Sequence, residues 1–177
     1  MAQYLGSWLR YMARLRLAPF VPSPTPVGEA MLSLARVRPN ETVLDLGCGD
    51  GRLLLKAVTE YGAGRGIGYE LDTDLVEAAR TAAAEHDQIQ IHEADALQAG
   101  HHIQEADVVM LYLTQRGNEA LLPLLRSSLL PKARVVSYVW DMGDGVPPRR
   151  TAIASGSGVV THWGKPNVLL WERDDLL

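Results

Sequence analysis

The stretch with the clearest chemical potential is VLDLGCGDGR at residues 43–52, in which three glycines stand at alternate positions. Gly47, Gly49 and Gly51 follow an apolar run, as in ligand-binding loops that come after a buried strand. The dinucleotide-binding fingerprint G-x-G-x-x-G is not met, because Arg52 stands where its last glycine would be. No Lys-Ser or Lys-Thr pair of the P-loop kind follows either.

The charges of this stretch say more about the ligand than the glycine spacing does. A pyrophosphate at a helix N-terminus needs donors and positive potential, and the carboxylates of Asp45 and Asp50 would repel it. They suit a ligand whose nearby end is cationic. S-adenosylmethionine (SAM) carries a sulfonium and an ammonium and has no phosphate, and glycines let the backbone approach such a ligand closely.

Two further acids are expected at the same edge of the sheet. Glu70 ends a second apolar strand, at a place where a carboxylate can accept both ribose hydroxyls of a nucleoside. Asp95 follows a third strand and could accept the adenine amino group. Together with Asp45 and the glycines, these acids predict a SAM site.

Apolar runs alternate with helical patterns along the chain, which predicts an α/β fold with a mostly parallel sheet. No convincing helix separates the last two strands, so we expect a C-terminal antiparallel hairpin. Thr73 or Asp74 is expected to cap the third helix. The expected strands are 42–46, 66–71, 89–93, 106–113, 133–138, 151–154 and 167–172, and the expected helices are 26–36, 51–61, 73–85 and 118–130.

The N-terminal part divides into two segments. Residues 1–18 form an amphipathic segment with arginines but no acid, and it either packs on its own domain or contacts a membrane surface or a partner protein. Residues 19–27, PFVPSPTPV, are proline-dense and predict a stiff, extended lead-in. Residues 19–177 then form one domain. The apolar positions of the first segment are Leu5, Trp8, Leu9, Met12 and Leu15.

The composition is that of an ordinary globular domain, with 177 residues and a hydrophobic fraction of 47%. The net charge of −4 argues against broad nucleic-acid binding. The single cysteine excludes an internal disulfide and suits a reducing compartment, so we expect a cytoplasmic protein. The sequence has no run of about 18 apolar residues, so no membrane-spanning helix is expected.

The motif LDLGCGDGR closely resembles the first motif of class I, seven-strand SAM-dependent methyltransferases. PFVPSPTPVGEAML, GDGRLLLKA, GIGYEL, NEALLPLL and ARVVSYVW also resemble, in order and spacing, the seven-strand protein-lysine methyltransferases. That subgroup includes broad-specificity archaeal enzymes and mitochondrial enzymes that act on an ATP synthase subunit. The resemblance covers about residues 19–173. It implies a Rossmann-like methyltransferase sandwich and methyl transfer to protein lysine.

The resemblance also implies which residues contact SAM. The lead-in would lie over the methionine end, where Phe20 replaces a tyrosine that is frequent in the subgroup. The implied cofactor-binding residues are Phe20, Ser23, Asp45, Gly47, Cys48, Gly49, Glu70, Leu71, Asp95, Ala96 and Tyr112.

Methyl transfer from a sulfonium requires alignment and exclusion of water more than acid–base help. A lysine acceptor must lose its proton, which an apolar pocket favours. Tyr112 and Thr114 after the fourth strand, and Tyr138 and Trp140 after the fifth, could form that pocket, with Tyr112 the first choice as a catalytic residue. The alternative for Tyr112 and Trp140 is core packing.

Other candidates are weaker. Cys48 has no histidine near it in sequence, so a small residue in a tight loop is favoured over a nucleophile. His101 and His102 lack a third ligand at useful spacing, so a polar loop is favoured and no metal is expected. The sequence LYLTQRG stands where base- or glutamine-directed enzymes have an NPPY-type motif. A small-metabolite or RNA substrate, or an inactive SAM-binding partner, remain the alternatives.

Overall fold

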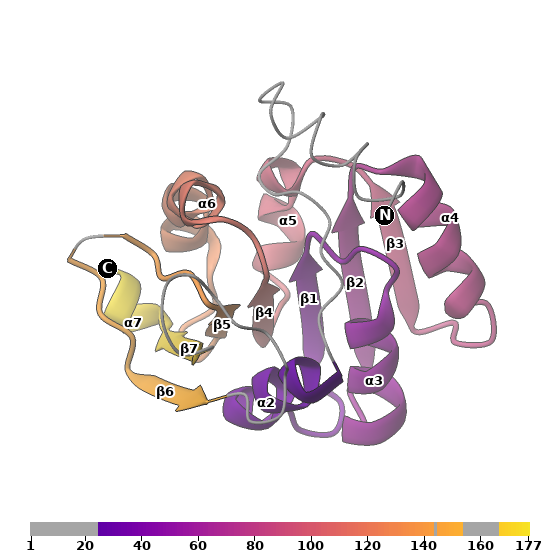
Figure 1. Ribbon diagram of the computed structural model, residues 1–177, viewed down its shortest axis with the longest axis horizontal. Coiled ribbons are helices and arrows are strands. Elements are labelled where there is room, and N and C mark those ends of the chain that lie inside the picture. The colour runs from indigo at the N-terminus through magenta and orange to yellow at the C-terminus, as the bar shows by residue number, and fades with distance from the viewer. Residues whose placement is uncertain (1–24, 144, 154–166) are drawn as a thin grey trace.

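The computed structural model describes residues 25–143, 145–153 and 167–177 (Figure 1). The amphipathic segment 1–18, Phe20 and Ser23 lie outside the described residues. Within the described ranges, no helix is long and apolar enough to cross a membrane.

The centre of the fold is a seven-stranded sheet in the order β3-β2-β1-β4-β5-β7-β6. Its first five members in this order pair in parallel, while β7 is antiparallel to both β5 and β6. This confirms the predicted mixed sheet with its C-terminal antiparallel hairpin. The strands are β1 (Thr42–Leu46), β2 (Arg65–Glu70), β3 (Ile89–Glu93), β4 (Val108–Leu111), β5 (Arg134–Tyr138), β6 (Arg150–Ile153) and β7 (Asn167–Glu172).

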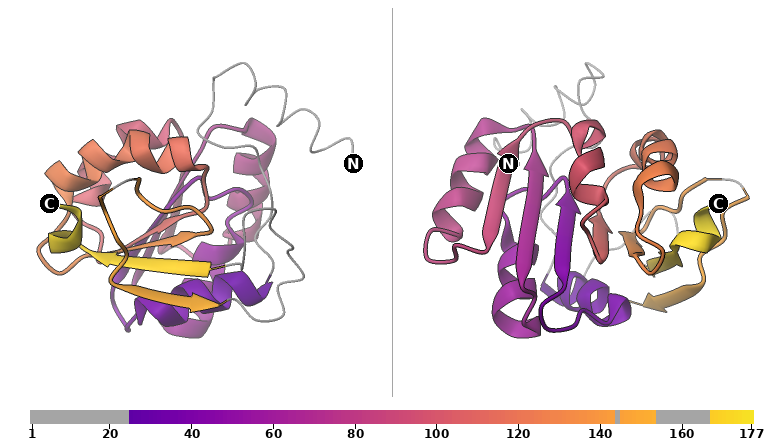
Figure 2. Two further views of the ribbon diagram at one scale, coloured as in Figure 1. Left: turned by 60° about the vertical axis from the view of Figure 1, so that its left-hand side comes forward. Right: turned by 180° about the vertical axis from the view of Figure 1, so that it is seen from behind.

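Helices pack on both faces of the sheet, as Figure 2 shows with α6 on one side and α2 on the other. Four of them match the predicted helices to within a few residues. The short elements η1, α5 and α7 were not predicted. The helices are α2 (Thr25–Ala35), α3 (Arg52–Tyr61), α4 (Thr73–Ala82), the 3₁₀ helix η1 (Ala96–Gln98), α5 (Gly100–Ile103), α6 (Gln115–Ser128) and α7 (Arg173–Leu176).

Alternate residues of each strand feed two separate hydrophobic clusters. Val43 of β1 joins the cluster beneath α2 and α3, whereas Leu44 and Leu46 join the cluster beneath α5, α6 and α7. Asp45 therefore points to the same face as Val43. Tyr112, just after β4, also packs against the α2–α3 cluster. Asp45 and Tyr112 thus share one face of the sheet, near the carboxyl ends of neighbouring strands.

Three local predictions need correction. Asp72, not Thr73 or Asp74, is the N-cap of α4, because its carboxylate accepts the backbone N–H of Asp74 at 3.1 Å. Helix α6 begins at Gln115, three residues before the predicted start, because Thr114 caps it. His101 and His102 lie in the helical turn α5 and not in a loop.

Strand β1 lies between β2 and β4, so the strand order reverses there. Ligands of open α/β sheets bind outside the carboxyl ends of the strands at such a switch point. Those ends point to the top of Figure 1, where the glycine loop follows β1. The fold therefore directs the predicted site residues to one edge.

Candidate functional site: the glycine loop and the ends of β2, β3 and β4

The loop after β1 turns sharply by using backbone conformations that suit glycine. Gly47, Gly49 and Gly51 have φ angles of 97°, 55° and 77°, in the region where a side chain causes strain. The amides of Gly47 and Cys48 both donate to the Tyr69 carbonyl at 2.9 Å, which fastens the loop to β2. Helix α3 begins immediately after, at Arg52.

Strand β2 passes directly beneath this loop, and only a glycine fits there. A Cβ atom on Gly68 would lie 2.6 Å from the Cys48 sulfur and 2.9 Å from a methyl group of Leu54. Both distances are shorter than van der Waals contact. The predicted strand GIGYEL therefore owes its central glycine to the close approach of Cys48.

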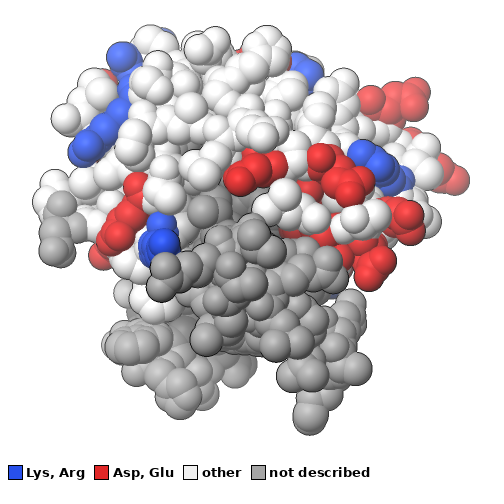
Figure 3. All heavy atoms as spheres, turned by 90° about the horizontal axis from the view of Figure 1, so that it is seen from above, with Lys and Arg blue, Asp and Glu red and all other residues white. Residues whose placement is uncertain are grey.

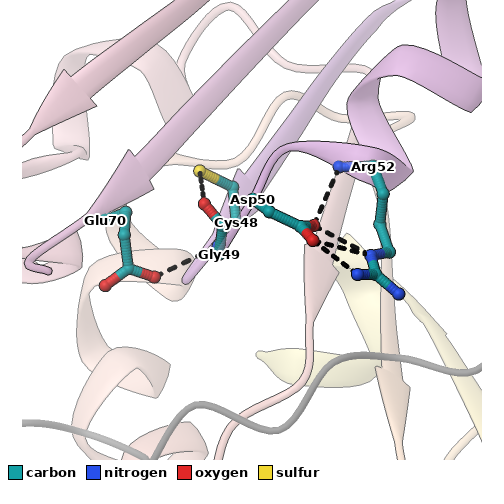
Figure 4. A network of polar contacts seen from close by, with 5 residues as sticks. All are labelled: Cys48, Gly49, Asp50, Arg52 and Glu70. Carbon is teal, nitrogen blue, oxygen red and sulfur yellow. Dashed lines mark hydrogen bonds and ion pairs between the residues drawn. The ribbon is translucent and has the colours of Figure 1, made fainter. Parts of the chain in front are cut away.

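The Glu70 carboxylate is held by three backbone amides at the end of β2. Its Oε1 accepts from the amides of Leu71 at 2.7 Å and Asp72 at 2.9 Å, and its Oε2 accepts from Gly49 at 3.1 Å. Figure 4 shows this carboxylate reaching across to the glycine loop. A carboxylate offers about four lone-pair sites, so capacity to accept ribose hydroxyls remains.

Asp45 is almost fully buried beside this loop, with 5% of its surface exposed. Burial, and secondarily the negative charges of Glu70 and Asp50, raises the pKa of its carboxyl to about 7. A buried acid in this state is stabilised as an anion by a nearby cation. The buried carboxyl of Asp45 thus fits a ligand with a sulfonium or an ammonium, as SAM has.

Asp50 contributes less to this charge than the sequence suggested. Its carboxylate forms a bidentate ion pair with Arg52, with nitrogen–oxygen distances of 2.5 and 2.8 Å (Figure 4). Burial alone would raise the pKa of Asp50, but hydrogen bonding to Arg52 and its charge lower it overall. The charge of Arg52 offsets that of Asp50, so the sequence analysis overstated how strongly Asp50 would repel a phosphate. The negative charge of the loop rests on Asp45 and Glu70.

The residues after β3 form the predicted adenine side. Asp95 caps η1, since its Oδ1 accepts the Leu97 amide at 2.9 Å. Ala96 is buried, whereas Leu71 after β2 and Leu97 in η1 are large apolar side chains with 38% and 43% of their surface exposed. Leu97 was missed, because an exposed apolar residue is visible only once the fold is known.

An aromatic pair lies at the ends of β4 and β5. The rings of Tyr112 and Tyr138 meet edge to face, with centroids 4.9 Å apart and planes at 69°. Tyr138 is fully buried and Tyr112 partly so. Burial, and secondarily the neighbouring Tyr138, raises the pKa of Tyr112 to about 12, so its hydroxyl is protonated at neutral pH. Thr114 has a capping role, accepting the Gly117 amide at 3.2 Å.

Cys48 and the pair His101 and His102 were the weaker candidates of the sequence. Burial, Asp45 and Glu70 raise the pKa of the Cys48 thiol, which makes it a poor nucleophile. His101 and His102 do have a third potential metal ligand, Glu105, with the three ligand atoms within 4.8 Å of one another. The sequence analysis did not identify Glu105, although this residue lies one helical turn after His101.

Protein contacts already engage this histidine cluster. Glu105 forms an ion pair with Arg65 at 2.6 Å and lies 3.2 Å from His101 Nε2, and His102 Nδ1 lies 2.7 Å from the Tyr69 hydroxyl. The cluster belongs to α5 and the turn after it, beside the beginning of β2.

The chain matches the ANTKMT methyltransferase domain over residues 45–149, more than half of its length. It belongs to this family. A protein-lysine N-methyltransferase of Saccharolobus islandicus is 31% identical over 143 residues, which are 78% of this chain and 87% of the relative. This methyltransferase is therefore a SAM-dependent enzyme of class I, as the resemblance of its first motif predicted.

Solved structures of other methyltransferases agree with this fold. The crystal structure of an RNA methyltransferase from Salinibacter ruber, in complex with S-adenosyl-L-homocysteine, has 39% sequence identity and a TM-score of 0.76. The match covers 86% of this chain and 93% of that one. TrmN from Thermus thermophilus, at 23% identity and a TM-score of 0.68, covers 85% of this chain and 49% of that one and shares the fold.

Proposed function

We propose that this methyltransferase transfers a methyl group from SAM to the side-chain amine of a lysine in a protein substrate. The observation that carries the proposal is the Tyr112–Tyr138 pair, an aromatic wall on the same face of the sheet as Asp45. The protein-lysine N-methyltransferase of Saccharolobus islandicus, matched over most of its length, supports this choice.

The cofactor side is assigned to the acids at the strand ends. Asp45 would balance the cationic methionine end, the amide-bound Glu70 would accept the ribose hydroxyls, and Asp95 would accept the adenine amino group. Leu71 after β2 and Leu97 in η1 have exposed apolar side chains that would pack against the adenine. When bound, SAM supplies a methyl group already activated by the sulfonium.

The acceptor side requires a neutral amine aligned with that methyl group. The pKa of a lysine side chain in water is roughly 10.4, and an apolar aromatic wall lowers it by disfavouring the ammonium. The ring of Tyr112 would exclude water and orient the amine, while its protonated hydroxyl is unsuited to act as a base at neutral pH. Alignment of this kind contributes about 7–11 kcal/mol to such reactions.

RNA is the second candidate acceptor, because the Salinibacter ruber structure at 39% identity is described as an RNA methyltransferase. Electrostatics favours protein. RNA binding relies on lysines and arginines that contact phosphates, whereas this chain has a net charge of −4. Figure 3, viewed onto the carboxyl ends of the strands, shows acidic side chains gathered on the right-hand side of the described surface, with few basic ones among them.

The test is transfer of labelled methyl groups by the full-length protein in a lysate of the source organism, with and without ribonuclease. We expect label on protein lysines, identified by mass spectrometry, in both samples. Glu70→Gln protein is the control for cofactor-dependent labelling. Label that disappears with ribonuclease, or that is found on small molecules alone, would overturn the proposed acceptor.

A further inference from the structure

A strained turn follows β5, directly after the buried Tyr138. Val139 has a φ of 70°, a value that a β-branched residue rarely adopts. The Trp140 amide donates to the Tyr138 carbonyl at 2.9 Å, two residues back, which makes this a γ-turn with positive φ, a rare and strained form. Such strain persists only where surrounding contacts enforce it.

The Val139 amide donates to the Asn167 carbonyl at 2.8 Å, and further contacts that enforce the turn come from Asn118, in the first turns of α6. This side chain is completely buried, and its Nδ2 donates to the Trp140 carbonyl at 2.9 Å and to the Asp141 carbonyl at 3.0 Å. It also lies 3.0 Å from the Ser137 hydroxyl, which itself donates to the Trp140 carbonyl at 2.6 Å. The side-chain amide of Asn118 therefore contacts the chain on both sides of Val139, at Ser137 before it and at Trp140 and Asp141 after it.

The carbonyl oxygen of the Asn118 side chain indicates that an asparagine at this position does not serve stability alone. Asn118 Oδ1 is buried and has no hydrogen-bond partner among the described residues. A buried acceptor without a partner costs free energy. A leucine or alanine would avoid that cost, so the asparagine is explained by what its Nδ2 holds in place.

The turn that Asn118 contacts is directly connected to the aromatic wall of Tyr112 and Tyr138. Tyr138 begins the strained turn, and its ring and that of Tyr112 meet edge to face. A second contact fastens the same loop, since Gln115 Nε2 donates to Asp141 Oδ1 at 2.8 Å. The start of α6 thus contacts the chain where it leaves β5, directly after Tyr138.

We infer that Asn118 is a positioning residue for methyl transfer: by clamping the Val139 turn it keeps the Tyr112–Tyr138 wall in the place that the acceptor requires. This inference rests on the proposed acceptor site. It predicts that the strained turn, and not the overall stability of the domain, limits turnover when Asn118 is changed.

The decisive experiment is a double-mutant cycle of Asn118→Ala and Val139→Gly. Asn118→Ala should lower kcat for the labelled acceptor about 10-fold or more while changing the SAM dissociation constant less than about three-fold. Val139→Gly in that background should restore kcat several-fold, because glycine adopts the positive φ without a clamp. If Asn118 acted on stability alone, Asn118→Ala would leave kcat per folded molecule unchanged, and Val139→Gly would shift only the unfolding midpoint.

Two controls keep the result interpretable. Ile103→Val, in the core beneath α5, measures how much turnover falls when the domain is merely destabilised. Ser137→Ala removes the second donor to the Trp140 carbonyl and replaces Asn118→Ala if that protein does not fold, with a smaller loss of kcat expected. Equal losses of kcat and SAM binding, or no rescue by glycine, would overturn the inference.

Failure of the proposed function looks different. In that case the wild-type protein labels RNA or a small molecule and not lysine, and the same cycle is then measured on that acceptor. Rescue by Val139→Gly on that acceptor would retain Asn118 as a positioning residue for another substrate. No rescue would overturn both the proposed function and the role of Asn118.

Discussion

The Gly49 amide donates a hydrogen bond to the Glu70 carboxylate, with 3.1 Å between the nitrogen and Oε2. This contact joins the loop after β1 to the end of β2, 21 residues later in the chain. One acid therefore holds the glycine loop and, in the proposed site, would also accept the ribose hydroxyls. Cofactor binding and the geometry of the loop would then be coupled through Glu70.

Glu70→Gln should weaken SAM binding about 10- to 100-fold. Glutamine has one carbonyl oxygen, so its NH₂ group would face either the Gly49 amide or the amides of Leu71 and Asp72. Isothermal titration calorimetry with SAM measures the loss. Glu93→Gln is the matched control, because Glu93 ends the neighbouring strand and accepts from the Thr73 hydroxyl, a contact that glutamine can keep. Equal losses in both proteins would contradict the assignment.

Asp45→Asn should stabilise the cofactor-free protein while weakening its affinity for SAM. The folded-state pKa of Asp45, about 7, is above the unfolded value, so ionisation of this acid destabilises the fold. That penalty is absent below about pH 4, grows between pH 4 and 7 and is complete above, where it is on the order of 4 kcal/mol.

The measurement for Asp45→Asn is unfolding of both proteins at pH 4 and pH 8. The stabilisation should be present at pH 8 and largely absent at pH 4. SAM binding to the wild-type protein should also weaken as the pH falls below about 7, because the carboxyl must then lose a proton to pair with a cation. The same stabilisation at both pH values would show that burial does not act on the charge of Asp45.

Gly68→Ala should destabilise the protein by about 1–3 kcal/mol, the usual cost of overpacking a core. The added Cβ would lie 2.6 Å from the Cys48 sulfur, so the glycine loop must shift. Gly66→Ala in the same strand is the control, because its Cβ would meet its nearest neighbour at an ordinary 3.4 Å. Urea denaturation compares the two. A loss in Gly66→Ala as large as that in Gly68→Ala would assign the effect to the strand and not to the contact with Cys48.

The sheet could be predicted because its signals are local. Strands β1, β3 and β7 begin and end where the apolar runs do, and the absence of a helical pattern before β7 indicated the antiparallel pair. The short helices could not be found in this way. Two of them begin at capping residues, Asp95 before η1 and the capping box of Glu172 and Asp175 at α7, whereas α5 has no side-chain cap.

The contacts between α6 and the chain after β5 were predicted less well than the positions of the acids at the strand ends. Asp45 and Glu70 stand at strand ends, so their positions follow from the strand pattern. The grip of Asn118 on Trp140 joins residues 22 apart through tertiary packing, and neither side chain marks it in the sequence. The Asp50–Arg52 pair is local, but counting charges without pairing them overstated the acidity of the loop.

Tyr112→Ala should lower kcat more than it weakens SAM binding, whereas Tyr112→Phe should retain most of the activity. The ring supplies the wall against Tyr138, and the hydroxyl is protonated up to a pKa of about 12. Steady-state kinetics with the labelled acceptor, together with SAM titration, separates the two effects. Because the hydroxyl stays protonated well above neutral pH, the pH profiles of wild-type and Tyr112→Phe proteins should coincide there. Equal losses of kcat and SAM affinity in Tyr112→Ala would make Tyr112 a cofactor contact or a core residue, and a large loss in Tyr112→Phe would assign the chemistry to its hydroxyl.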